Sequence, residues 1–239
     1  MTLADDIETA LAEEGSAERA VQEAAYLKSD LRFLGVSMPR IRSVTLGACK
    51  AAGALDHDAV VALVEELWAP PVFERRAAAV EVLTYYVELL GPADLPLLER
   101  LVRESRTWAL SDGLGASVIG EIVQRDPAGS ASALDRWSVD DDFWLRRTSL
   151  LALLLGLRRG EGDFERFARY ADGMLEETEF FIRKAVGWVL RDAARKRPEL
   201  VADWIAPRVR RMAGLTLREA VKHLPPDRRE ELLAAYRAR

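Results

Sequence analysis

The chain has 239 residues, of which 49% are hydrophobic and 31% charged, and its formal net charge is −5. This is an ordinary composition for a soluble globular protein. The sequence contains no run of about 18 apolar residues, which is the length needed to span a membrane. The single Cys49 excludes an internal disulfide and a cysteine-ligated zinc site, and the acidic N-terminus does not resemble a signal peptide. The sequence therefore predicts a cytoplasmic protein without a metal or another cofactor.

Apolar residues recur with a spacing near 3.6 along the chain, and proline and glycine interrupt this pattern at intervals. The interruptions fall at Pro70-Pro71, Gly91-Pro92, Asp126-Pro127, Gly160-Glu161-Gly162 and Pro225-Pro226. No segment alternates with the two-residue period of a strand. Helices are expected, in chain order, at residues 2–14, 16–28, 39–52, 56–69, 72–90, 94–105, 108–125, 128–137, 141–159, 162–174, 178–197, 199–213, 216–223 and 226–237.

An internal repeat runs through these expected helices. Each repeat is anchored by a large residue that is followed, in most units, by basic residues two and three places later. The anchors are Met38, Phe73, Trp108, Trp144, Phe181 and Leu215, so successive anchors lie 34 to 37 residues apart. This period predicts an all-α fold, a curved α-solenoid of HEAT-like helical repeats that forms a single domain over residues 1–239. We expect the second helix of each pair to line a basic concave face.

Charge is unevenly distributed along the chain. Residues 181–239 carry 15 basic and 7 acidic side chains, although the whole chain is acidic. Local charge matters more than the total for nucleic-acid binding, because phosphate contacts are short-ranged and screened over about 10 Å. A solvated helix face is the alternative explanation for any one basic run, but basic pairs in the same phase of successive units favour a phosphate-binding surface.

The unit anchored at Trp108 differs from its neighbours, because it lacks the basic pair and has Asp112 four residues later. Residues four apart share one face of a helix, so the indole and the carboxylate should point the same way. Trp188 and Arg147 occupy nearby positions in other repeat units. Two indoles, a carboxylate and a guanidinium together would suit a cationic ligand beside a phosphate backbone. A dipole-favoured acid, core tryptophans and a surface salt bridge stay open as structural alternatives for these residues.

Other catalytic machinery is absent from the sequence. There is no glycine-rich phosphate loop and no GxSxG motif, and His57 and His223 do not have the spacing of metal ligands. The sequence as a whole resembles the AlkD-type DNA alkylation repair glycosylases, which are built from HEAT-like repeats. The resemblance covers nearly the whole chain and is carried by Tyr26, residues 33–36, Pro39-Arg40, residues 108–112, residues 144–148 and residues 179–191.

The resemblance implies excision of positively charged N3- and N7-alkylated purines from double-stranded DNA, by hydrolysis of the N-glycosidic bond and without base flipping. Asp112 would stabilise the sugar cation and position water, and Trp108 and Trp188 would flank the deoxyribose. Arg147 would hold the nearby phosphate. The resemblance implies that Tyr26, Lys184 and Arg191 bind DNA. We expect Arg183, Arg76 and Arg40 to bind DNA as well, because they occupy basic positions of the repeat.

Two other functions stay open. One is a non-catalytic HEAT-repeat protein that binds damaged or distorted DNA, which would have no need for a carboxylate among phosphates. The other is a protein-interaction solenoid, for which apolar or mixed residues would be expected on the concave face. A monomer is expected for either of these proteins and for the glycosylase.

Overall fold

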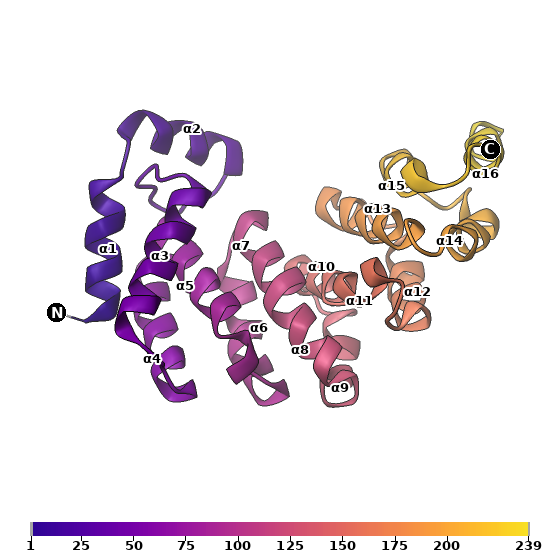
Figure 1. Cartoon of the computed structure of the whole chain (residues 1–239). Coiled ribbons are helices and arrows are strands. Elements are labelled where there is room, and N and C mark those ends of the chain that lie inside the picture. The colour runs from indigo at the N-terminus through magenta and orange to yellow at the C-terminus, as the bar shows by residue number, and fades with distance from the viewer. Residues whose placement is uncertain (1, 239) are drawn as a thin grey trace. The chain divides into compact units, whose positions relative to one another are not determined.

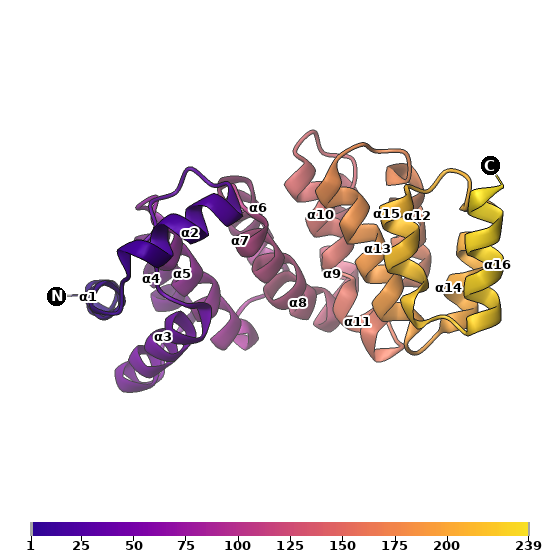
Figure 2. The same ribbon diagram turned by 90° about the horizontal axis from the view of Figure 1, so that it is seen from above.

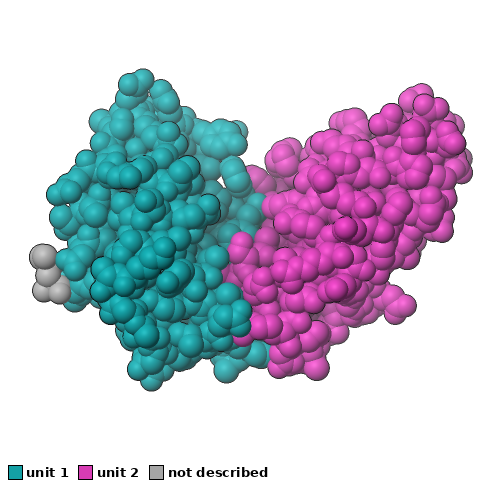
Figure 3. Space-filling view, viewed as in Figure 1, with its two compact units in different colours: residues 1–114 teal, residues 115–239 magenta. Residues whose placement is uncertain are grey.

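The computed structural model describes residues 2–238, which fold as helices joined by short turns. They form two compact units, Met1–Leu114 and Gly115–Arg239 (Figure 3). Within residues 2–238 there is no strand, and one isolated backbone bridge joins Arg32 and Val72. The predicted all-α fold of helical repeats is thus confirmed, whereas the single domain over residues 1–239 stays a prediction.

In the first unit a central helix is enclosed by its neighbours. The elements are α1 (Leu3–Glu13), α2 (Ala17–Leu27), α3 (Met38–Ala52), α4 (His57–Trp68), α5 (Phe73–Tyr85), η1 (Val87–Leu89), η2 (Pro92–Asp94), α6 (Leu95–Glu104) and α7 (Trp108–Asp112) (Figure 1). Helix α5 packs against α3, α4 and α7, and its residues 73–83 are all buried. A helix that is buried on every side needs a partner for each polar residue. In α5, arginines donate hydrogen bonds to neighbouring carbonyls, and the acids accept hydrogen bonds from neighbouring segments.

The second unit is organised around α13. After the π-helix η3 (Gly113–Ile119) follow α8 (Gly120–Arg125), α9 (Pro127–Trp137), α10 (Phe143–Leu151), α11 (Leu154–Arg159), α12 (Phe164–Met174), α13 (Phe180–Ala194), α14 (Pro198–Ile205), η4 (Ala206–Arg208), α15 (Gly214–Ala220), η5 (Val221–His223) and α16 (Pro226–Arg237). Helix α13 packs against α10, α11, α14 and α15. Figures 1 and 2 both show α13 and α15 side by side.

Several expected helices are shorter than their apolar pattern suggests. The helix expected at 72–90 ends at Tyr85 and continues as η1, and the one expected at 199–213 ends at Ile205. Pro207 has no backbone N–H to continue that helix, and the chain tightens into η4. The helix expected at 141–159 divides into α10 and α11 at a short turn.

Side-chain bonds between neighbouring helix pairs repeat with the period found in the sequence. In the first unit, Trp68 donates to Glu104, 36 residues later, and His57 donates to Asp94, 37 residues later. In the second unit, Arg158 donates to Asp192 over 34 residues. Each bond joins equivalent parts of successive repeats, so the repeat is a unit of packing as well as of sequence.

Candidate functional site

Helix α7 carries the first candidate cluster. Its N-terminus follows Arg106, which has a left-handed backbone with φ of 51°, and is capped by the Thr107 hydroxyl. Trp108 and Asp112 open and close this single helix and are both half-buried. Their side chains are one turn apart, as predicted, so the indole and the carboxylate belong to the same face of α7.

The segment expected as a helix at 108–125 is helical throughout, but it changes type, because the π-helix η3 begins directly after Asp112 and separates α7 from α8. A Cβ atom added at Gly113 would lie 2.8 Å from Cγ1 of Val80 on α5, so glycine permits the close approach of the two helices there. π-Helical segments are rare and are frequently found at functional sites. Asp112 therefore sits where the backbone changes from α- to π-helix.

Tyr26 reaches the same cluster from the end of α2. Its ring meets the Trp108 ring edge to face, with centroids 6.0 Å apart and planes at 85°. The Tyr26 side chain remains 71% exposed, which leaves its hydroxyl accessible for a phosphate contact. The structure thus brings together three of the predicted residues, Tyr26, Trp108 and Asp112, in the first unit.

A buried carboxylate fixes the loop that follows α2. Glu74, on the first turn of α5, accepts hydrogen bonds from the backbone N–H groups of Leu34, Gly35 and Val36 at 2.8, 2.7 and 3.2 Å. Phe33 stacks on Phe73 with ring centroids 5.0 Å apart. Residues 33–36, which the resemblance includes, thus attach the loop after α2 to the core helix α5.

In the second unit, Arg147 is only 3% exposed. Its Nη1 donates to the backbone carbonyl of Phe181, and its guanidinium lies 5.8 Å from the centre of the Phe181 ring. Trp144 packs against the same ring at 5.0 Å. Arg147 is therefore held firmly between α10 and the start of α13.

Trp188 and Arg191 share a partner on α13 that the sequence analysis did not select. The Trp188 indole N–H donates to Oδ2 of Asp192 at 3.3 Å, and Nε of Arg191 donates to Oδ1 at 3.0 Å. Arg191 also forms an ion pair with Glu219. The signal was present in the sequence, since Trp188 and Asp192 have the same four-residue spacing as Trp108 and Asp112.

The repeated basic pairs are mostly occupied in joining the helices. The first arginine of each pair donates to a carbonyl six to nine residues earlier in the chain. Arg75 donates to Leu67 and Glu66 at the end of α4, Arg146 to Asp140, and Arg183 to Glu177. These bonds join the helices to one another. A phosphate contact by the first arginine of the pair, as predicted for Arg183, stays a prediction.

Arg76 is the predicted DNA-binding residue whose position is least suited to that role. It is 8% exposed, donates to the carbonyls of Trp68 and Glu104, and lies over the Trp68 ring at 5.0 Å. Burial lowers the pKa of its guanidinium. Its observed contacts hold the end of α6, just before α7, and its role in DNA binding stays a prediction.

The remaining candidates are closer to the surface. Arg40 is exposed and forms an ion pair with Glu14, away from the contacts of Trp108. Lys184 is exposed on the first turns of α13, where its ammonium lies 5.9 Å from the centre of the Phe180 ring. Of the basic residues in phase across the repeat, Lys184 is thus the best placed to meet a phosphate.

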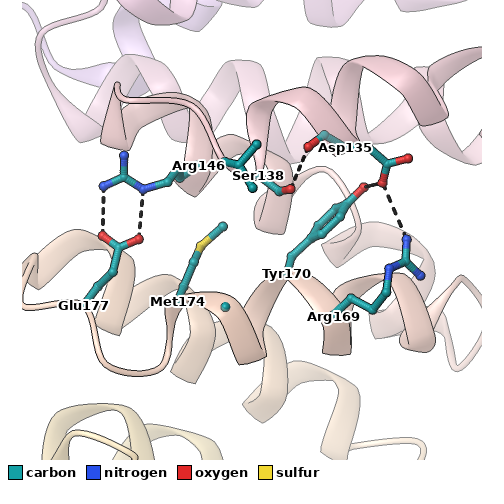
Figure 4. Close-up of a pocket in the computed structure, with 9 residues that line it drawn as sticks. Asp135, Ser138, Arg146, Arg169, Tyr170, Met174 and Glu177 are labelled. Atoms are coloured by element: carbon teal, nitrogen blue, oxygen red, sulfur yellow. Dashed lines mark hydrogen bonds and ion pairs between the residues drawn. The ribbon is translucent and has the colours of Figure 1, made fainter.

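A separate cavity of about 410 Å³ lies in the second unit between α9, α10 and α12 (Figure 4). Its polar groups bond to one another: Tyr170 donates to Asp135 at 2.5 Å, and Arg146 forms a forked ion pair with Glu177. Burial and the bond to Asp135 raise the pKa of Tyr170, which keeps its proton at neutral pH. None of the predicted site residues lines this cavity.

Residues 2–238 contain no group of three or more histidine, cysteine and acidic side chains arranged to hold a metal ion. Among the same residues, no helix combines the length and the apolar character needed to cross a bilayer.

Comparisons with known proteins bear on the family. A family model described as DNA alkylation repair enzyme matches residues 7–224. A solved structure described as a predicted DNA alkylation repair enzyme from Enterococcus faecalis has 20% identity, covers 89% of this chain and 98% of its own, and has a TM-score of 0.80. AlkD2 from Streptococcus mutans has 18% identity, coverage of 86% and 99%, and a TM-score of 0.59. At these identities the structural likeness shows a shared fold. No functionally curated protein has a matching sequence.

Proposed function

This chain belongs to the DNA alkylation repair enzyme family, and we propose that it is a DNA glycosylase that excises N3- and N7-alkylated purines from duplex DNA. The observation that carries the proposal is the cluster on α7. There, a half-buried carboxylate, Asp112, shares one turn with the indole of Trp108, and the Tyr26 ring covers the edge of that indole.

The chemistry of alkylated purines matches such a cluster. Alkylation at N3 or N7 gives the base a positive charge, so the purine leaves as a neutral group when the C1′–N bond breaks. Both bonding electrons go to the base, and the sugar takes on cationic character until the oxygen of a water molecule bonds to C1′ and a proton is released. Asp112 would stabilise this sugar cation and orient the water, as carboxylates do in glycoside hydrolysis.

Residues of the second unit would complete the recognition of DNA. We assign Trp188 to the deoxyribose of the lesion, as the resemblance implies, because indole faces attract cations by about 0.5–2 kcal/mol each. Arg147 would bind the phosphate beside the lesion from the fixed position that its bond to Phe181 gives it. Lys184, Arg191 and Tyr26 would contact the backbone. With the cationic base already activated, extrusion of the base into a pocket is not required.

The test is release of free base from a duplex that contains N7-methylguanine. Wild-type protein should release the base faster than a protein-free control, and Asp112→Asn should lower the single-turnover rate by about 10²-fold, which is typical of losing one key electrostatic group. Asp141→Asn, which alters an exposed acid in the turn before α10, should leave the rate unchanged.

The alternatives predict different outcomes in the same experiment. Tight DNA binding without base release by the wild type would indicate a non-catalytic binder of damaged DNA. Absence of DNA binding would contradict both DNA functions and point to a protein-interaction role. Equal release by wild type and Asp112→Asn would show that Asp112 is structural.

A further inference from the structure

Asp192 is a buried acid next to a candidate catalytic residue, and the proposed reaction gives it no role. It lies on α13 one turn after Trp188 and is 4% exposed. Its Oδ2 accepts Nε and Nη2 of Arg158 at 2.9 and 2.7 Å and the indole N–H of Trp188 at 3.3 Å. Its Oδ1 accepts Nε of Arg191 at 3.0 Å. Four donors from three side chains therefore meet on one buried carboxylate.

The carboxylate is held in its charged form. Burial alone would raise the pKa of Asp192, but hydrogen bonds from Arg158 and then Arg191 outweigh burial, and the net pKa is lowered. An indole has a single donor, its N–H, and bonds to ionised acceptors are stronger than bonds to neutral ones. The orientation of the Trp188 ring thus depends on an acceptor whose charge is maintained by two arginines.

The helix that carries both residues is itself fixed at this point. A Cβ atom at Gly187 would lie 2.8 Å from Cβ of Glu219 and 2.9 Å from the Thr216 carbonyl, so α13 and α15 touch directly beside Trp188. Thr216 also donates to the carbonyl of Arg183 at 3.0 Å. With the backbone immobilised, the remaining freedom of Trp188 lies in its side-chain torsions, which the bond to Asp192 restricts.

We propose that Asp192 is a positioning residue that fixes the indole of Trp188 in the orientation used to bind the deoxyribose of the lesion, and that Arg158 and Arg191 hold Asp192 for this task. The inference rests on the proposed function of Trp188. It assigns Arg191 to the support of Trp188 in addition to any contact with DNA. Because small displacements of a positioning group can cost about 10²-fold in rate, loss of this bond should be visible in catalysis.

The first test observes the indole directly and does not depend on base release. In a ¹H–¹⁵N spectrum, the Trp188 indole resonance is identified as the one missing from Trp188→Phe. Asp192→Asn should shift or broaden that resonance and leave the other indole resonances in place. An unmoved Trp188 resonance in a folded Asp192→Asn protein would overturn the proposal.

A milder variant guards against misfolding of Asp192→Asn. Arg158→Gln removes the guanidinium that forms two hydrogen bonds to Asp192, at a side chain that is 48% exposed. This variant should also move the Trp188 resonance. Arg159→Gln is the matched control, since the adjacent side chain is 52% exposed and pairs with Glu121. Equal spectra for Arg158→Gln and wild type, or equal perturbations from Arg158→Gln and Arg159→Gln, would contradict the proposal.

The second test is a double-mutant cycle in single-turnover release of N7-methylguanine. Asp192→Asn should lower the rate about 10- to 100-fold in the wild-type background and less than about twofold in Trp188→Phe, because the substituted residue no longer has an indole N–H to orient. Independent, multiplying effects would overturn the positioning role. If the wild type releases no base, the proposed function fails, while the indole resonance still decides whether Asp192 orients Trp188.

Discussion

At the residue scale, most guanidinium groups of this protein connect helices to one another. Arg75, Arg146 and Arg183 occupy one position of the repeat and donate to carbonyls six to eight residues earlier in the chain. A guanidinium presents several N–H donors in a fixed plane, which suits it to the free carbonyls at helix ends. DNA affinity must then come from fewer cations than the sequence contains, among which Lys184 is exposed.

His57 gives a pH-dependent prediction at the same scale. Its imidazole donates to Asp58 at 2.9 Å and to Asp94 at 2.8 Å, and these bonds raise its pKa above the usual 6.5. A raised pKa in the folded state favours folding while the group is protonated. The stabilisation should be complete below pH 6.5 and should be lost as the pH rises through the raised value.

Urea unfolding of wild type and His57→Gln at a series of pH values between 5 and 9 would test this. The difference in unfolding free energy should be largest at the acidic end and shrink towards alkaline pH. A difference that stays constant over the series would show that the protonated imidazole does not contribute.

The sequence pattern predicted some of these residues better than others. The turn that carries Trp108 and Asp112 was identified because one repeat departs from its neighbours. Asp192 was not identified, because an acid within a basic run is expected to be a surface charge unless its burial is known. The burial of Arg76 was not predicted either, because phase within a repeat does not distinguish an arginine directed to solvent from one directed to a carbonyl.

At the element scale, glycine placement shapes the region around the candidate site. Gly35 has φ of 81°, and a Cβ atom there would lie 2.1 Å from the Ser16 carbonyl oxygen and 2.6 Å from the Ala20 nitrogen. Gly53 has nearly the same φ, 82°, but nothing within 4 Å. The pair therefore separates the cost of a left-handed backbone from the cost of crowding against α2.

We expect Gly53→Ala to lower the unfolding free energy by about 1–3 kcal/mol, because φ of 82° and ψ of −158° lie in a region that is essentially restricted to glycine. Gly35→Ala should lower it by about 1–3 kcal/mol more than Gly53→Ala does, because overpacking against α2 adds that amount to the cost of the backbone conformation. Denaturant titrations that give the two variants equal losses would show that α2 moves away without resistance.

Helix boundaries were predicted well where proline or a capping side chain marks them. Ser16, Asp56 and Asp163 each accept a hydrogen bond from the first turn of their helix, and the three helices start one or two residues after the expected positions. The π-helix after Asp112 was not predicted. It begins at Gly113, where α5 approaches so closely that a Cβ atom would lie 2.8 Å from Cγ1 of Val80, and the local sequence does not reveal such a tertiary contact.

At the scale of the whole molecule, an acidic protein is proposed to bind a polyanion. Its basic excess lies in residues 181–239, so affinity for duplex DNA should fall steeply as salt rises. Lys184→Gln should reduce the slope of log K against log salt by about 0.9, the value for one lost phosphate contact. Lys196→Gln, an exposed lysine beyond the end of α13, is the control and should leave the slope unchanged. Identical slopes for both variants would show that Lys184 does not contact a phosphate.

The one-repeat spacing of the side-chain bonds also has a consequence for how the chain folds. The bonds from Trp68 to Glu104 and from Arg158 to Asp192 close loops of 36 and 34 residues in a chain of 239. Contact order is therefore low, and the loop-closure entropy of each step is small. Folding can begin at any adjacent pair of repeats and spread to its neighbours. During translation, each repeat of this protein should therefore pack against the next repeat as soon as that repeat has emerged from the ribosome.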